Sequence, residues 1–194
     1  MTWTHNPRTA VLLWIAFTFP FTIWDSLYIF LRPHTLLGHK RHSPIWDPID
    51  SYAAVDKIYS KQAWLENEGW TATQCVINMT DVAIYLWYFW VLKTQGERMR
   101  IGERAGGLAC VLGLIGGTVT LTKSSLYWMR ECFSGFKYIG HADWVPLFST
   151  WGFMNVVYCA ASSYMIFTFA KDIIEGLSLI EESSKRGGKA RKRA

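Results

Sequence analysis

The chain has 194 residues, of which 51% are hydrophobic, 16% aromatic and only 18% charged, with a formal net charge of +5. This length is typical of one domain. The positive charges gather in two short stretches and form no folded basic module, which argues against a nucleic-acid-binding protein. The four cysteines have no paired spacing, so neither a disulfide framework nor a metal site is indicated, and we expect no cofactor.

Four long apolar blocks contain few charges and are separated by charged segments; they cover residues 10–31, 72–92, 108–129 and 144–169. Each has roughly the 20 residues that a helix needs to cross the hydrocarbon core of a bilayer. A secretory signal peptide is a poor interpretation of the first block, because it is long and aromatic, contains Asp25 and is followed by no small-residue cleavage site. We therefore predict an all-α integral membrane protein with four transmembrane helices.

The positive charges predict the orientation of these helices. They gather in "KTQGERMRIGER", between the second and third blocks, and in the tail "KRGGKARKRA". With four spans, both segments and the N-terminus share one side, which the positive-inside rule makes cytosolic. We expect a cytosolic segment at 1–9, a membrane domain at 10–170, and at 171–194 a basic, disordered cytosolic tail that contacts anionic lipid.

Each apolar block also has a stripe of polar and aromatic residues at helical spacing, which places the stripe on one face. Turning all four stripes inward creates a shared intramembrane cavity. In chain order, the stripes are Thr18, Phe21, Asp25, Tyr28 and Arg32; Gln74, Asn78, Asp81 and Tyr85; Gly116, Thr120, Lys123, Tyr127 and Glu131; and Trp151, Asn155, Tyr158 and Ser162.

Three of these residues are charged: Asp25, Asp81 and Lys123. A charge at mid-membrane costs about 2.5–3.5 kcal/mol on insertion scales, so each should face the interior and have a partner. Asp81 and Lys123 either form an ion pair that fixes helix packing, with a hydrogen bond from Asn78, or belong to a functional cavity. Asp25 has no basic residue near it in its own block, which favours a functional role.

The first loop contains "PIWDPIDSYAAVDKIYSKQAWLENEGW", in which Tyr52, Asp56 and Tyr59 bracket a short helical stretch outside the membrane. Spacings of four and three put these residues on one helical face. Asp56 is then either a solvated helix charge or a carboxylate that reaches the mouth of the cavity between the two tyrosines.

The ordered set of "TIWDSLYIF", "YAAVDKIY", "LWYFWVL", "SSLYWMRE", "GFKYIGHADW" and "GFMNVVY" resembles the EXPERA family of sterol isomerases and sigma-2-type receptors, over residues 10 to 170. The resemblance implies a four-helix bundle whose cavity opens toward the bilayer, an endoplasmic reticulum location and a homodimer. It aligns Asp25 with the acid of the family's first shared helix, Asp56 with its loop aspartate, and Met154 and Asn155 with its Met-Asn pair. The isomerase's histidine corresponds to Phe21, and its glutamate has no clean counterpart: a gapless match through "LWYFW" places Thr80 there, with Asp81 adjacent.

The function expected from these residues is a cofactor-free isomerase or cyclase that transfers protons on a lipophilic polycyclic substrate such as a sterol, terpenoid or polyketide. Asp25 would be the acid or cation stabiliser, Asp81 or Asp56 its partner, and Lys123 would tune Asp81. The alternative is a non-catalytic receptor or trafficking protein that binds sterols or amphiphiles. In that case Asp25 and Asp56 would recognise an amine or hydroxyl rather than move protons. We expect membrane lipids as partners, and we expect the substrate-binding residues to be Trp24, Tyr28, Tyr52, Asn78, Lys123, Tyr127, Trp151 and Asn155.

Overall fold

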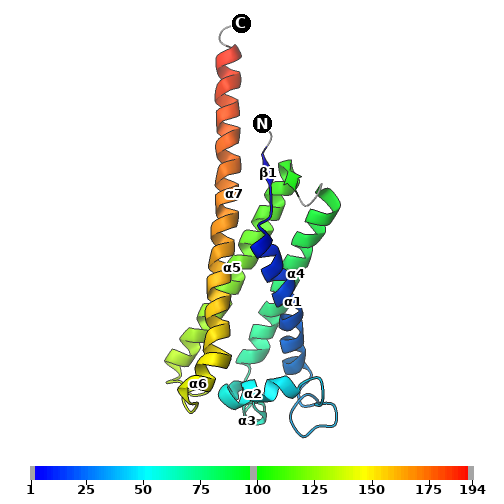
Figure 1. The fold of residues 1–194 in the computed structure, drawn as a ribbon, viewed down its shortest axis with the longest axis vertical. Helices are drawn as coiled ribbons and strands as arrows, with labels where there is room; N and C mark the ends of the chain where they lie inside the picture. Colours follow the sequence, from blue (N-terminus) through cyan, green and yellow to red (C-terminus); the bar gives the residue numbers. More distant parts are fainter. Residues whose placement is uncertain (1–2, 97–99, 192–194) are drawn as a thin grey trace.

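The computed structural model describes residues 3–96 and 100–191, with the backbone alone at 103 and 183–191, and it is mostly helical (Figure 1). Its four long helices are α1 (Thr9–Phe30), α4 (Trp70–Gln95), α5 (Glu103–Phe133) and α7 (Phe153–Arg191). In length and composition, four helical stretches are apolar enough to cross a membrane: Thr9–Phe30, Trp70–Gln95, Arg104–Phe133 and Trp144–Glu182. The four predicted apolar helices are therefore confirmed; the ends of the first three differ from the predicted ends by a few residues, and the fourth continues well beyond residue 169.

The long helices pack in chain order, with α1 against α4, α4 against α5 and α5 against α7. Glycines of α5 allow the closest approaches, because a side chain there would overlap a neighbour. A Cβ atom on Gly113 would lie 2.2 Å from the Phe169 ring of α7, and one on Gly116 would lie 2.5 Å from the Tyr85 ring of α4. These contacts form the main core, which fills the half of the bundle nearest the termini and includes Val11, Ile15, Tyr85, Tyr88, Leu112, Met165 and Phe169.

The connections divide between the two ends of the bundle (Figure 1). Both termini lie at the end where α4 is followed by α5. The opposite end holds the short elements α2 (Asp47–Val55), η1 (Lys57–Tyr59), α3 (Lys61–Leu65) and α6 (Trp144–Pro146). The helical stretch predicted in the first loop is thus confirmed, although it breaks at Asp56.

The N-terminal segment departs from the all-α prediction. Strand β1 (Thr4–His5) pairs antiparallel with β2 (Ile101–Gly102), which precedes α5. His5 is buried, with Nδ1 2.8 Å from Asp172 Oδ2 and Nε2 3.1 Å from the Tyr88 hydroxyl. Two-residue strands are too short to produce a period in the sequence, so the pairing of β1 with β2 could not be predicted.

The fourth apolar block also differs from its prediction. Instead of one helix over 144–169, α6 is followed by a π-helical segment, η2 (Leu147–Gly152), and then by α7. Helix α7 continues to Arg191, so the tail expected to be disordered is helical there; 171–191 contains no proline and includes the helix formers Leu, Glu, Lys and Arg. Residues 1–2 of the N-terminal segment, 97–99 of the basic loop and 192–194 of the tail lie outside the described residues.

Candidate functional site

A cavity of about 390 Å³ lies at the loop end of the bundle, between all four long helices. Its walls come from the later turns of α1 and α5 and the first turns of α4 and α7, and residues of α2 and η1 cover it. The volume falls in the usual range of small-molecule sites. The four stripes predicted from the sequence do turn inward, but only their loop-side portions reach this cavity, because the main core fills the rest of the bundle.

Seven of the predicted site residues line the cavity and four do not. The lining residues are Trp24, Asp25, Tyr52, Asn78, Lys123, Tyr127 and Asn155. The four that lie behind the wall are Tyr28, Asp56, Asp81 and Trp151.

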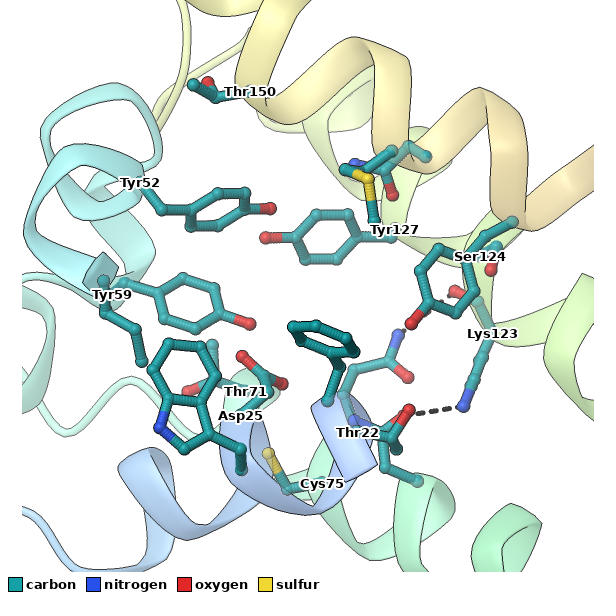
Figure 2. Close-up of a pocket in the computed structure, with 18 of the residues that line it drawn as sticks. Thr22, Asp25, Tyr52, Tyr59, Thr71, Cys75, Lys123, Ser124, Tyr127 and Thr150 are labelled. Atoms are coloured by element: carbon teal, nitrogen blue, oxygen red, sulfur yellow. Dashed lines mark hydrogen bonds between the residues drawn. The ribbon is translucent and has the colours of Figure 1, made fainter. Parts of the chain in front are cut away.

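Asp25 lies in the second half of α1, and its carboxylate borders the cavity (Figure 2). The hydroxyl of Tyr59 points toward this carboxylate and is its hydrogen-bonding neighbour. Lys123 and Arg32 are the cations whose charges act on it. No cation of the described chain lies within ion-pair distance of it. Asp25 is therefore a carboxyl group in an aromatic cavity without a salt-bridge partner.

Three tyrosines form a row beside Asp25. The rings of Tyr52 and Tyr59 meet edge to face with their centroids 5.0 Å apart, and the hydroxyls of Tyr52 and Tyr127 point toward one another (Figure 2). Burial raises the pKa of Tyr52 and of Tyr59 well above the usual value, helped by the nearby carboxylates Asp56 and Asp25. Both hydroxyls therefore remain protonated and can donate hydrogen bonds to a ligand.

The sequence suggested that Asp56 reaches the mouth of the cavity between Tyr52 and Tyr59, but in the structure it does not. Helix α2 ends at Val55, and Asp56 is fully buried behind Tyr127, whose hydroxyl donates to its Oδ2. Its Oδ1 accepts from the Ile58 amide at 3.1 Å. Burial raises the pKa of Asp56 to about 6, although these two hydrogen bonds oppose the shift. The interpretation of Asp56 as a solvated helix charge is wrong.

Asp81 and Lys123 form a close ion pair, with Nζ 2.6 Å from Asp81 Oδ2. Nζ also donates to Asn78 Oδ1 at 2.7 Å (the dashed line in Figure 2), and the Thr120 hydroxyl donates to Asp81 Oδ2 at 2.9 Å. Asp81 is buried behind Lys123, so the cavity meets the ammonium and the Asn78 amide rather than this carboxylate. The pair predicted as a packing device is present.

Tyr28 and Trp151 support lining residues from behind. The Tyr28 hydroxyl donates to the Tyr59 carbonyl at 3.1 Å. Trp151 packs against Trp128 and Tyr127, with ring centroids 4.5 and 5.9 Å apart. Trp151 lies in the π-helical η2, whose wider turn changes the direction of side chains relative to a regular α-helix. The assumption of α-helical spacing therefore misplaced it.

Sequence reasoning left several lining residues out of the site. Tyr59 was placed near the mouth and Phe21, Gln74 and Tyr158 on stripes, but none was assigned to the site. The cavity also contacts residues just beside the stripes, which strict helical spacing passes over: Thr22, Cys75, Ser124 and Thr150. Thr71, three residues before Gln74, continues the second stripe but precedes the predicted block at 72–92. A wider arc around Asp25 and Lys123 would have found Thr22 and Ser124.

Comparison with protein-family models, with curated proteins and with solved structures gives no match to this chain. The chemistry of the site therefore has to be argued from its own residues. These offer one unpaired carboxyl group, several tyrosine hydroxyls, an ammonium group held at one wall, and the ring faces of tryptophan and tyrosine.

Proposed function

We propose that the protein is an EXPERA-type membrane isomerase or cyclase that protonates a lipophilic polycyclic substrate with Asp25 and needs no cofactor. The observation that carries the proposal is the Asp25 carboxyl group, which borders an aromatic cavity without an ion-pair partner. A desolvated carboxyl group can hold its proton and deliver it to an alkene, carbonyl or epoxide. Substrates of the expected class are sterols, terpenoids and polyketides.

The aromatic wall supports the same chemistry. Protonation of an alkene carbon leaves positive charge on the neighbouring carbon, and the ring faces of Trp24 and Tyr59 would stabilise that charge. Loss of a proton from a different carbon gives an isomer, and attack by an internal carbon nucleophile before that loss gives a ring. The Asp25 carboxylate left behind regains a proton from solvent, and the group that accepted the proton of the substrate cation releases one to solvent, so no net proton is consumed.

Asp56 and Tyr127 supply a proton acceptor in this scheme. The Tyr127 hydroxyl borders the cavity and donates to the Asp56 carboxylate. It can take a proton from the substrate cation while its own proton moves to Asp56. The pKa of Asp56, raised by burial to about 6, suits a base that works near neutral pH. Asp81 keeps Lys123 in place, and Lys123 with Asn155 would orient polar groups of the substrate.

The proposed membrane orientation follows from the two ends of the bundle. The termini and the connection between α4 and α5, which carries the basic loop, lie at one end (Figure 1), and the positive-inside rule would place that end in the cytosol. The cavity then lies toward the lumenal face of the endoplasmic reticulum membrane. Substrate would enter from the bilayer between α1 and α7, where Phe21 and Met154 line the cavity and are both exposed.

The test is to incubate purified protein in detergent with a lipid extract, in deuterated water, and to analyse the products by mass spectrometry. We expect wild type to change a compound of the extract or to introduce deuterium at one of its carbons. We expect Asp25→Asn to form none of this product. Asp143→Asn is the matched control, because Asp143 is exposed, outside the cavity and without a capping hydrogen bond. Equal turnover by wild type and Asp25→Asn would refute the role of Asp25.

A second candidate function is a receptor or trafficking protein for sterols or cationic amphiphiles. The aromatic residues Trp24, Tyr52 and Tyr59 around a carboxylate form the kind of site that binds an amine. In that case lipids would copurify unchanged with wild type, would bind Asp25→Asn more weakly, and would gain no deuterium at carbon.

A further inference from the structure

Three side chains that ligate metals converge in the first loop, outside the four apolar helical stretches, and none of the three lines the cavity. They are His42, just before α2, and Asp47 and Asp50 in the first turn of α2. One donor atom from each lies within 4.8 Å of the other two. Nothing in the spacing of these residues indicated a site, because the turn between His42 and α2 is what brings them together.

His42 is held in the orientation of a metal ligand. Its ring is buried, and its Nδ1 lies 2.6 Å from the Thr35 carbonyl oxygen. A carbonyl can only accept, so Nδ1 carries a hydrogen, and Nε2 faces the carboxylates at 3.0 Å from Asp50 Oδ2 and 3.6 Å from Asp47 Oδ1. Histidine ligands of metals usually donate their other ring N–H to a carbonyl or carboxylate in this way.

The surroundings also fix the carboxylate of Asp47. The Ser43 hydroxyl donates to Asp47 Oδ2 at 3.0 Å, which leaves Oδ1 turned toward His42. The Thr35 backbone is itself anchored, since its buried hydroxyl donates to the Tyr28 carbonyl at 2.6 Å. Groups outside the cluster therefore orient two of the three donors.

We propose that His42, Asp47 and Asp50 bind a divalent cation of the Zn²⁺ class. Ligand bonds of about 2.0–2.2 Å place neighbouring donor atoms about 3.0 Å apart at octahedral angles and about 3.4 Å apart at tetrahedral angles. The distances of 3.0 and 3.6 Å from Nε2 lie close to these values, and all three donor atoms lie within 4.8 Å of one another. One imidazole and two carboxylates suit Zn²⁺ and ions of similar preference.

Binding at this site balances charge and leaves room for water. The two carboxylates neutralise the ion, and His42 binds as the neutral ring, so the hydrogen that Nε2 shares with Asp50 is released to solvent. The Asp47 and Asp50 side chains are 51% and 36% exposed, which gives the ion an entry path and water as further ligands.

The site would act on the cover of the cavity. Helix α2 carries Ile49 and Tyr52, both of which line the cavity. A metal ion bound to its first turn would tie α2 to the preceding loop through His42 and so hold this cover in one position. The inference does not depend on what the cavity binds.

Two other donor groups need to be distinguished from this site. His34 and His39 have ring nitrogens 3.3 Å apart, but they supply two donors only; His34 is exposed and His39 is half-buried. His5, Cys110 and Asp172 also converge, but His5 and Cys110 are both buried, so this group lacks the open entry path that the exposed Asp47 gives to the loop cluster. A substitution of His39 in the first group therefore serves as the matched control. A metal bound by the Cys110 thiolate of the second group would be recognised by its charge-transfer absorption band.

The experiment is a Co²⁺ titration of the purified full chain in detergent, followed by visible absorption, with displacement by Zn²⁺. We expect one Co²⁺ with nitrogen and oxygen ligands, a loss of this signal in His42→Gln, and at least about tenfold weaker binding in Asp47→Asn, by analogy with the 10–100-fold losses for outer-shell partners. His39→Gln should bind as wild type does.

Several results would overturn the proposal. They are the absence of Co²⁺ binding by wild type, an unchanged titration in His42→Gln or Asp47→Asn, and a thiolate charge-transfer band that places the metal at Cys110. Loss of the signal in His39→Gln would also overturn the proposal, because it would assign the ion to the His34–His39 pair. If His42→Gln does not fold, Asp47→Asn decides the question, because Asp47 is half exposed and tolerates the change.

Discussion

Replacing Lys123 with methionine should destabilise the protein more than any loss of apolar contact would explain. The substitution leaves the Asp81 carboxylate buried without its cation, and Asp81 Oδ1 already has no hydrogen-bond partner among the described residues. Removing one member of a buried pair typically costs about 3–5 kcal/mol. Asp81→Asn should cost less, about 1.5–3 kcal/mol, because Lys123 keeps Asn78 as an acceptor and loses one charged hydrogen bond.

The double variant Lys123→Met/Asp81→Asn distinguishes the cost of an uncompensated buried charge from the cost of lost apolar contacts. It removes both charges, so it should be more stable than the sum of the single losses predicts, by about 2 kcal/mol or more, within the range of coupling energies for residues in contact. The assay is reversible unfolding in mixed detergent micelles, followed by the fluorescence of the 11 tryptophans. A coupling below about 0.5 kcal/mol would refute the reasoning, because that value is typical of an exposed pair.

Three further predictions concern Asp56 and α5. Between about pH 4 and 6 the folded protein holds the Asp56 proton and the unfolded chain does not, so stability falls as pH rises, by up to about 1.4 kcal/mol for each pH unit. Asp56→Asn should remove this part of the pH dependence of Tm. Tyr127→Phe deletes a bond to the charged form, so it should move the upper end of that window to higher pH. Gly113→Ala should lower stability by about 1–3 kcal/mol through overlap with the Phe169 ring, whereas Gly107→Ala, with nothing within 4 Å of the added Cβ atom, should leave Tm unchanged or raise it.

Much of the site could be predicted because helical spacing constrains which side chains share a face. The stripes that contain Asp25, Asn78, Lys123 and Asn155 each bring at least one residue to the cavity wall. The spacing could not show how deep each residue lies, since that depends on how far neighbouring helices are apart. Close packing of α5 against α4 and α7 closes the bundle beyond Lys123, so Asp81 has no access to the cavity.

The local backbone decided the remaining errors. Asp56 was predicted to continue a helix between Tyr52 and Tyr59, but α2 stops at Val55, and the turn sends the carboxylate behind Tyr127. Trp151 was expected to share a face with Asn155, and the π-helical η2 turns it toward Trp128 instead. A one-residue change in helical register is enough to move a side chain from a cavity wall to the packing behind it.

The sequence by itself determined the four apolar helices and the presence of carboxylates within them. It also determined that the positive charges gather in the connection between the second and third helices and in the C-terminal tail. These follow from composition and period, which act over neighbouring residues. Only the tertiary structure decided that Asp25 borders the cavity without an ion-pair partner among the described residues, that Asp81 is neutralised by Lys123, and that His42 meets the carboxylates of α2. Such meetings depend on contacts between residues distant in the chain or across a turn, and no periodic pattern encodes them.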